Sequence, residues 1–535
     1  MKAGSMRRTR RAAQGVPLVS ALVLAMLLLS VTVNVHAAIT TRTWQNSGAP
    51  WNTGANWGGN VPNSGGNNGE RARLPNAASV VNPSLNANIT ISDLEIHNDQ
   101  ADYNVVKPSS GTRTLTIQPG GANATEGIYL SGGGTSIGTA ATTAAGIKIA
   151  PKGAQTWDIT GTLTLYGTGA GGGNINDNSG EITKTGPGTV MLDNGGAYGG
   201  GLARLVVHQG TITGTAASST QINLFATSGD ALTMYGSTEI SLIRFAIPAG
   251  GQSVRFNGSG SGTARRLGSI TLGGPNNGAA TTTFNIDDGD ADLDMEITGT
   301  FGEWGQGSGN QTTVNIVKTG PGTLAIAGGV CDGTTTVNQG TLLVTGTHTV
   351  DDSKGSWGGT PTGDYTVASG ATLGGGGTID LSALGGSVTV QAGGNLSPGD
   401  TYDPTGTFTL TLGTGTLDVS AIAGTGGLKF DLDTIADSDK VVVGSSLNIG
   451  TLDFSDFTFT GLGGFWQGEY LLFQASSIIG NIGSAAGEVG TFDATLIQQG
   501  NDILLQVIVP EPSTFLIWAL GLIGLAWCAR RRRTK

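Results

Sequence analysis

Cysteine and histidine are scarce in this chain of 535 residues, which holds two cysteines and four histidines. Cys528 lies in an apolar stretch near the C-terminus, so Cys331 stands alone in the body of the sequence. A single cysteine cannot form an intramolecular disulfide, and we therefore expect the fold to depend on packing. No histidines and cysteines have the spacing of metal ligands, and no nucleophile motif is present. We predict no catalytic residue, no cofactor-binding residue and no metal site.

Charged residues are also few, at 12% of the chain, and the basic ones are unevenly placed. Ten of the 27 lysines and arginines lie in the terminal segments 1–37 and 510–535, whereas 37 of the 38 acidic residues lie between these segments. Nucleic-acid phosphates require clustered Lys and Arg, which this acidic body lacks. We therefore expect no nucleic-acid partner.

Glycine is abundant, with 92 residues, and it separates short runs in which Leu, Ile and Val alternate with Thr and other polar residues. This pattern predicts short β-strands joined by tight turns. The segment Lys-Thr-Gly-Pro-Gly-Thr occurs twice, at 184–189 and 318–323, within the repeats 181–215 and 315–347. Proline presets φ, and the glycine after it accepts a positive φ, so each Gly-Pro-Gly predicts a type II turn.

A strand of four to six residues cannot bury a face alone, but stacked units share a core. We predict an all-β, right-handed parallel β-solenoid over 111–425, preceded by an aromatic entry region or cap at 38–110. Residues 426–509 are expected to form a C-terminal β region or cap. Tandem β-sandwich domains remain an alternative for part of the body.

The two repeats resemble the autotransporter-associated β-strand repeat, which begins with Lys-x-Gly-x-Gly-Thr-Leu and closes with Val-x-x-Gly-Thr-Leu. The resemblance covers about 65 residues and implies a rod like the passenger of those proteins. The rest of the body shares with that repeat only its alternating strands and glycine turns.

Two further stretches suggest contacts. In Asp287–Ile297, four acidic residues alternate with apolar ones, which on a strand would place the carboxylates on one solvent-exposed face. Near the start of the body, Trp44, Trp51 and Trp57 cluster within 14 residues. These indoles either cover the first rung or stack on sugar rings, and the second alternative would make the protein a carbohydrate-binding module.

The N-terminal residues 1–37 combine a basic start, an apolar run and the small-residue ending Val35-His36-Ala37. This order is typical of a secretory signal peptide, and we expect the chain to be exported.

The C-terminal residues 510–535 contain Pro510, Glu511 and Pro512, an apolar run at 515–529, and then Arg530, Arg531, Arg532 and Arg533. Fifteen residues rise about 22 Å as a helix, somewhat less than the hydrocarbon core. We predict one transmembrane helix, with the arginines retained on the cytoplasmic side of the inner membrane.

This order resembles the PEP-CTERM sorting signal of Gram-negative bacteria. The resemblance implies processing at Pro510–Pro512 by an exosortase-type enzyme, in bacteria that typically make exopolysaccharide. It also implies an inner-membrane intermediate, followed by the cell surface or extracellular matrix.

Together, these features favour an exported structural or adhesive β-solenoid of the cell surface, associated with exopolysaccharide or a biofilm matrix. The carbohydrate-binding module is the alternative, and a β-helical polysaccharide-cleaving enzyme is a third, less favoured one.

Overall fold

The structure is a computed structural model that describes residues 40–509 with gaps, together with residues 523, 525–527, 530 and 531. The longest gaps are 63–69, 106–112, 120–125, 139–146, 167–174, 194–200, 215–221, 246–251, 258–264, 273–279, 304–312, 351–360 and 400–405. The predicted signal peptide and most of the predicted helix 515–529 therefore lie outside the described residues.

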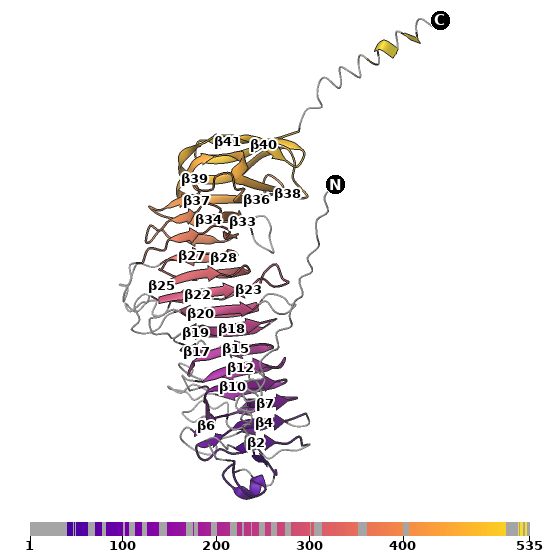
Figure 1. Cartoon of the computed structure of the whole chain (residues 1–535), viewed down its shortest axis with the longest axis vertical. Helices are drawn as coiled ribbons and strands as arrows, with labels where there is room; N and C mark the ends of the chain where they lie inside the picture. Colours follow the sequence, from indigo (N-terminus) through magenta and orange to yellow (C-terminus); the bar gives the residue numbers. More distant parts are fainter. Residues whose placement is uncertain are drawn as a thin grey trace, which may run out of the picture.

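The body is a stack of short parallel strands that rises from β2 at one end to β39 at the other (Figure 1). Rung by rung, the strands pair in three columns. The first column contains β1 (Thr40–Thr43), β2 (Glu70–Leu74), β4 (Asp93–His97), β7 (Glu126–Ser131), β10 (Ala154–Ile159), β12 (Glu181–Thr185), β15 (Arg204–Val207), β18 (Asp230–Tyr235), β20 (Gln252–Asn257), β22 (Ala280–Ile286), β25 (Val314–Thr319), β27 (Thr335–Val337), β29 (Tyr365–Val367), β32 (Val388–Val390), β35 (Thr416–Asp418) and β37 (Lys440–Leu452).

The second column contains β5 (Tyr103–Val105), β8 (Gly134–Ile137), β11 (Thr162–Tyr166), β13 (Thr189–Asp193), β16 (Thr211–Gly214), β19 (Glu239–Phe245), β21 (Arg265–Leu272), β23 (Met295–Ile297), β26 (Thr323–Val330), β28 (Thr341–Thr349), β30 (Thr372–Gly375), β33 (Asn395–Pro398), β36 (Leu428–Leu432) and β38 (Phe457–Gly461). Some strands are long enough to take part in two columns: β19, β21, β26 and β28 of the second column and β37 of the first also belong to the third column. The other strands of the third column are β14 (Gly201–Leu202), β17 (Ile222–Leu224), β24 (Phe301–Glu303), β31 (Thr378–Asp380), β34 (Thr407–Thr411) and β39 (Gly468–Ile482). In the early rungs β3 (Ile89–Ile91), β6 (Arg113–Ile117) and β9 (Ile147–Pro151) form a separate parallel sheet.

The interior of the stack is one continuous apolar core that extends from Trp44 to Val507. Many strands build it by alternation, as in β22, where Ala280, Thr282, Phe284 and Ile286 point inward and the residues between them are half-buried. Burial of one strand face by the neighbouring rungs supplies the hydrophobic stabilisation that an isolated strand lacks. The predicted all-β parallel solenoid is confirmed.

The two sequence repeats share a buried lysine that joins the corners of adjacent rungs. Lys184 is fully buried, and its Nζ donates to the carbonyl oxygens of Gly186 and Gln209, each at 2.9 Å. Lys318 donates in the same way to Gly320 at 2.9 Å and Gln339 at 3.0 Å. Burial lowers the pKa of each ammonium to about 8. The motif therefore encodes a corner clamp, in which the lysine holds the Gly-Pro-Gly turn against the Gln-Gly turn of the next rung.

The turn type predicted for Gly-Pro-Gly was wrong. The positive φ falls on the glycine before proline, with φ of 75° at Gly186 and 76° at Gly320. The glycine after proline serves a different purpose, because a Cβ on Gly188 would lie 2.1 Å from the carbonyl oxygen of Gly161 in the preceding rung. Close contact between rungs, and not turn geometry, requires glycine there.

The prediction of one acidic strand face in Asp287–Ile297 was also wrong. Only Met295–Ile297 forms a strand, and Asp294 is buried. Its two carboxylate oxygens accept hydrogen bonds from the backbone N–H groups of Gly289 and Thr323, both at 2.7 Å. The residues before the strand form a corner that Asp294 ties to the next rung, so the carboxylates do not line up.

The two ends of the core are closed differently. At the N-terminal end the 3-10 helix η1 (Gly54–Trp57) brings Trp57 against Trp44 and Trp51, with ring centroids 4.9 and 4.7 Å apart. At the other end, η3 (Phe454–Asp456) is followed by β40 (Ala486–Val489), β41 (Phe492–Gln499) and β42 (Asp502–Ile508). These strands and β39 pair antiparallel, which ends the parallel stack (Figure 1).

Among the residues that the structure describes, no helix is long and apolar enough to cross a membrane. Arg530 and Arg531 are described, and the Arg531 guanidinium carbon lies 5.0 Å from the centroid of the Trp527 ring. Pro510, Glu511, Pro512, Arg532 and Arg533 lie outside the described residues.

The corner clamp predicts a large difference between two glycine substitutions with similar backbone angles. Gly340 has φ 66° and Gly370 has φ 79°, but a Cβ meets two carbonyl oxygens at 2.5 Å in Gly340 and open space in Gly370. We expect Gly370→Ala to lower the free energy of unfolding by about 1 kcal/mol through backbone strain alone. Gly340→Ala should cost roughly 3 kcal/mol, because overpacking is added. Urea denaturation of both variants measures the difference, and equal losses would contradict the clamp.

Candidate functional site

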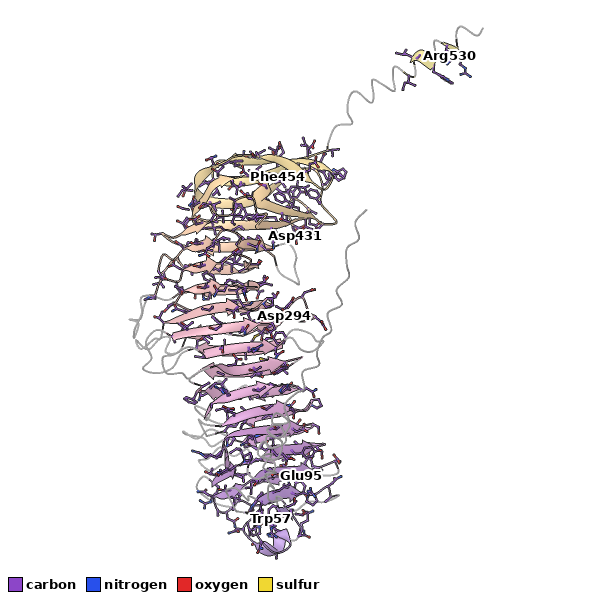
Figure 2. All side chains as sticks on the ribbon, in the orientation of Figure 1. Trp57, Glu95, Asp294, Asp431, Phe454 and Arg530 are labelled. Atoms are coloured by element: carbon purple, nitrogen blue, oxygen red, sulfur yellow. The ribbon has the colours of Figure 1, made fainter. Side chains whose placement is uncertain are left out.

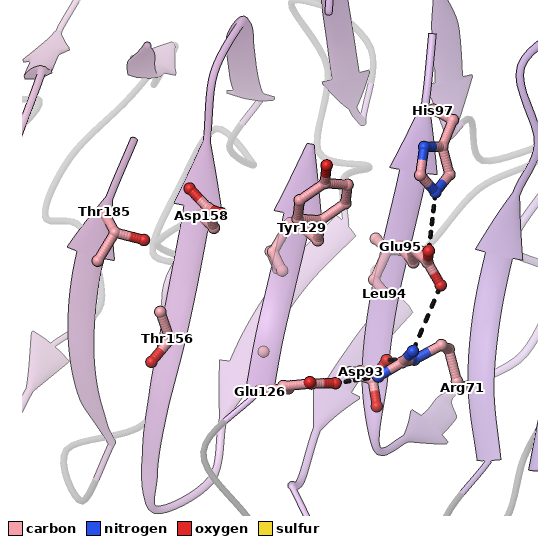
Figure 3. Close-up of a pocket in the computed structure, with 12 residues that line it drawn as sticks. Arg71, Asp93, Leu94, Glu95, His97, Glu126, Tyr129, Thr156, Asp158 and Thr185 are labelled. Carbon is pink, nitrogen blue, oxygen red and sulfur yellow. Dashed lines mark hydrogen bonds and ion pairs between the residues drawn. The ribbon is translucent and has the colours of Figure 1, made fainter. Parts of the chain in front are cut away.

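A cavity of about 420 Å³ lies on the outer face of the first column, near the N-terminal end of the rod (Figure 3). Five stacked strands, β2, β4, β7, β10 and β12, contribute to it. Its lining side chains are mostly polar, and we call these residues the outer groove: Arg71, Asp93, Glu95, His97, Glu126, Tyr129, Thr156, Asp158 and Thr185.

The rung-to-rung register places these side chains in rows. Arg73 is the register partner of Glu95, Glu95 of Tyr129, and Tyr129 of Asp158. Because alternate residues of a strand point outward, the sequences "ERARL" and "DLEIH" present Arg71, Arg73, Glu95 and His97 on the same face. Side chains as far apart in the sequence as Arg71 and Glu126, which are 55 residues apart, thereby become neighbours.

Arg71 is the central cation of the groove. Its guanidinium forms ion pairs with Asp93 and Glu126, and it lies 3.6 Å from a Glu95 oxygen. Burial alone would lower the pKa of Arg71, but these carboxylates raise it above its ordinary value. The Arg71 guanidinium on β2 thus binds the carboxylate of Asp93 on the neighbouring strand β4 and that of Glu126 on β7, one rung further.

Two of the three carboxylates beside Arg71, those of Asp93 and Glu95 on β4, have pKa values that are shifted in opposite directions. Asp93 is 4% exposed, its Oδ2 has no hydrogen-bond partner among the described residues, and burial raises its pKa to about 6 despite Arg71. Burial would also raise the pKa of Glu95, but hydrogen bonds from Arg73 and His97 lower it below its usual value. At neutral pH both are ionised, and Asp93 is the one that gains a proton on mild acidification.

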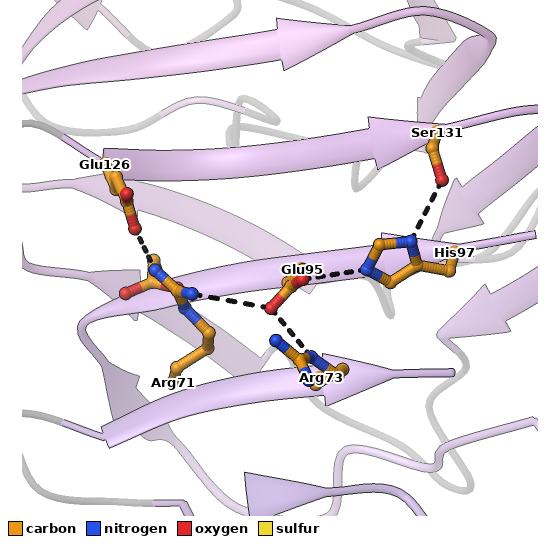
Figure 4. Close-up of polar contacts among 7 residues, drawn as sticks. Arg71, Arg73, Glu95, His97, Glu126 and Ser131 are labelled. Atoms are coloured by element: carbon orange, nitrogen blue, oxygen red, sulfur yellow. Dashed lines mark hydrogen bonds and ion pairs between the residues drawn. The ribbon is translucent and has the colours of Figure 1, made fainter. Parts of the chain in front are cut away.

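A chain of hydrogen bonds continues from Glu95 along the rim (Figure 4). Glu95 Oε1 lies 2.7 Å from His97 Nε2, and the Ser131 hydroxyl lies 3.1 Å from His97 Nδ1. A hydroxyl, an imidazole and a carboxylate in sequence are the parts of a nucleophilic triad. Here Glu95 is also bound by Arg73 at 2.8 Å, and Ser131 is not among the residues lining the cavity. The chain orients His97 toward its neighbour Tyr129, whose ring centroid is 5.4 Å away.

The residues singled out from the sequence for a carbohydrate contact lie elsewhere. Trp44, Trp51 and Trp57 are at most 2% exposed and fill the end of the core, as Figure 2 shows for Trp57 at the tip of the rod. Because the indole faces are buried, these three rings offer no exposed surface on which a sugar ring could stack. Within the described residues, no group of three or more His, Cys, Asp or Glu side chains could hold a metal ion.

Sequence reasoning missed the outer groove altogether. The available signal was the alternation of charged residues at 71, 73, 93, 95 and 97, which marks outward faces. The strands that carry it are separated by loops of unequal length, so the sequence does not show which outward residues become neighbours.

Comparison with protein families identifies one segment. The family model described as the PEP-CTERM protein-sorting motif matches residues 509–532. No curated protein matches the chain. The sorting signal implies recognition by an exosortase-type processing enzyme and export to the cell surface.

The raised pKa of Asp93 predicts a specific pH dependence of stability. The folded state binds this proton more tightly than the unfolded state, in which the pKa is about 4, so the contribution of Asp93 to stability falls as pH rises from about 4 to about 6. Asp93→Asn removes this term. We expect the variant to gain about 2 kcal/mol relative to the wild type between pH 4 and pH 7. Urea denaturation across that range tests this, and parallel profiles for the two proteins would contradict it.

Proposed function

We propose that the protein is an exported, rod-shaped component of the cell surface that is retained in extracellular polysaccharide through the outer groove. Its body would act through extended shape and surface, and its C-terminal signal would hold it at the inner membrane until processing. The rod would then remain at the surface or within the matrix.

The sorting signal and the architecture support the first part of this proposal. A parallel solenoid whose core is closed at both ends exposes long outer faces. The motif of the two repeats resembles that of autotransporter-associated β-strand repeats, and the corner clamp that both repeats share is consistent with this resemblance.

The composition of the outer groove supports a polysaccharide as the ligand. Carboxylates and guanidinium groups form hydrogen bonds with sugar hydroxyls, and the Tyr129 ring, 38% exposed, offers an apolar face to a sugar ring. Four carboxylates line the cavity against one arginine. This balance of charge favours a neutral polysaccharide over one that carries uronate or sulfate groups.

We propose binding without catalysis. Two arginines engage the carboxylate that would orient His97, and the Ser131 hydroxyl bound to the imidazole lies outside the cavity lining. A nucleophilic hydroxyl must face the bound substrate, whereas Ser131 does not line the cavity.

Co-sedimentation with purified exopolysaccharide of the host tests the proposed ligand. We expect Tyr129→Ala and Glu126→Gln each to weaken retention several-fold, because the first removes the apolar face and the second the charge opposite Arg71. Glu488→Gln is the matched control, since Glu488 is exposed on β40 in the C-terminal cap. Equal retention of all variants would exclude the outer groove as the contact.

A further inference from the structure

Among the described residues of the body, six large apolar side chains are exposed, and four of them lie near the point where the chain leaves the body; the other two are Tyr129 and Ile479. Trp466 is 59% exposed, Ile435 58%, Ile508 51% and Val509 42%. Val509 is the last described residue of the body, and it directly precedes Pro510. Most other large apolar side chains of the rod are buried. A group of exposed ones typically marks a surface that contacts another molecule or a membrane.

Strand pairing brings these residues to one corner of the C-terminal cap. Gly468, at the start of β39, is the register partner of Val507, and Asp493, at the start of β41, is the partner of Ile508. The segments just before β39 and β41 therefore meet beside the end of β42. Ile435 joins them, because its Cδ1 covers the face of Gly468, 2.5 Å from where a Cβ would lie. We call this set the exit corner: Ile435, Phe465, Trp466, Phe492, Ile508 and Val509.

Trp466 is held outward by contacts on its backbone and ring. The Tyr470 hydroxyl accepts from the Trp466 N–H at 3.0 Å and donates to its carbonyl oxygen at 2.7 Å. The indole meets the Phe492 ring edge-on at 5.4 Å, and Phe465 meets the same ring at 5.4 Å. The exposed indole is thus a fixed feature of the surface. Such rigid, amphipathic rings suit an interface between water and an apolar phase.

The length of chain beyond Val509 decides which interface is within reach. Only residues 510–514 separate Val509 from the apolar run that begins at Phe515. Six Cα–Cα steps span at most about 20 Å, so an inserted tail keeps the exit corner within about that distance of the hydrocarbon core. The headgroup region of one leaflet occupies the first several ångströms of this interval. The short connection to the inserted tail therefore keeps this corner close to lipid.

The charges around the exit corner favour uncharged lipid surface. Asp433 accepts a hydrogen bond from the Gly464 N–H, Glu469 follows Gly468, and Asp493 neighbours Ile508. These carboxylates would be repelled by anionic headgroups, whereas the indole and the aliphatic side chains partition into the interface without charge.

We propose that the exit corner inserts into the headgroup region of the periplasmic leaflet while the tail is embedded, and so seats the rod upright with Pro510–Pro512 at the membrane surface. This inference rests on the proposed function, because it requires an anchored tail. It assigns the cap a role in presenting the processing site at a fixed height.

Fluorescence quenching by brominated lipid tests the contact in the full chain, reconstituted in zwitterionic phosphatidylcholine vesicles. Trp518 and Trp527 lie in the predicted membrane helix and report whether the tail is inserted. The signal of Trp466 is the difference between the wild type and Trp466→Ala, whose backbone contacts with Tyr470 are retained. We expect bromine on the lipid to remove most of this difference signal. A double variant, Trp466→Ala with Tyr129→Trp, carries its exposed indole near the far end of the rod and should show no added quenching (Figure 1).

The outcomes separate the two proposals. Quenching of the tail tryptophans without quenching of the Trp466 signal would overturn the seating of the exit corner and leave the anchored tail intact. Absence of quenching in the tail tryptophans would overturn the anchored intermediate itself. A Trp466 signal that is insensitive to lipid but changes on addition of an exosortase-type enzyme would assign the corner to that enzyme, and would also overturn the lipid contact.

Discussion

Parallel pairing of each rung with the next is the constraint on which the rest of the structure depends. It places paired strand residues above one another, so that inward faces form a continuous core and outward faces form rows of side chains. Corners must pass close to the preceding corner, which is why Gly188 and Gly322 lack space for a Cβ. Where corners leave carbonyl oxygens without strand partners, Lys184 and Lys318 supply the donors, and burial of these polar groups becomes tolerable.

The same constraint creates the surfaces to which we assign function. Rows of outward side chains on β2, β4 and β7 become an outer groove because their register aligns arginine, carboxylates and tyrosine across rungs. At the other end the parallel stack must stop, and the antiparallel strands β39 to β42 close it. That closure also places Trp466 beside the point from which the sorting signal departs. The polar outer groove and the apolar exit corner thus lie at opposite ends of one rod (Figure 1).

The fold class could be predicted from the sequence because alternation and glycine corners are local signals. The repeats were found through Lys184 and Lys318, but their burial was not foreseen, since lysine is almost never fully buried without partners and those partners are backbone carbonyls of another rung. The outer groove could not be predicted, because loop lengths conceal which of Arg71, Glu95 and Tyr129 become neighbours. The cluster of Trp44, Trp51 and Trp57 was visible, but its spacing alone did not distinguish a buried end of the core from an exposed sugar contact.

The central claim is that this rod is exported, anchored by its tail and then processed at the sorting signal. Intact mass and location of the protein in its host test that claim most directly, for the wild type and for a variant carrying Pro510→Ala and Pro512→Ala. The account predicts a wild-type species that has lost both terminal segments and is found outside the inner membrane, and a variant that stays in the membrane fraction with its arginines. A wild-type protein that retains residues 513–535 would contradict it.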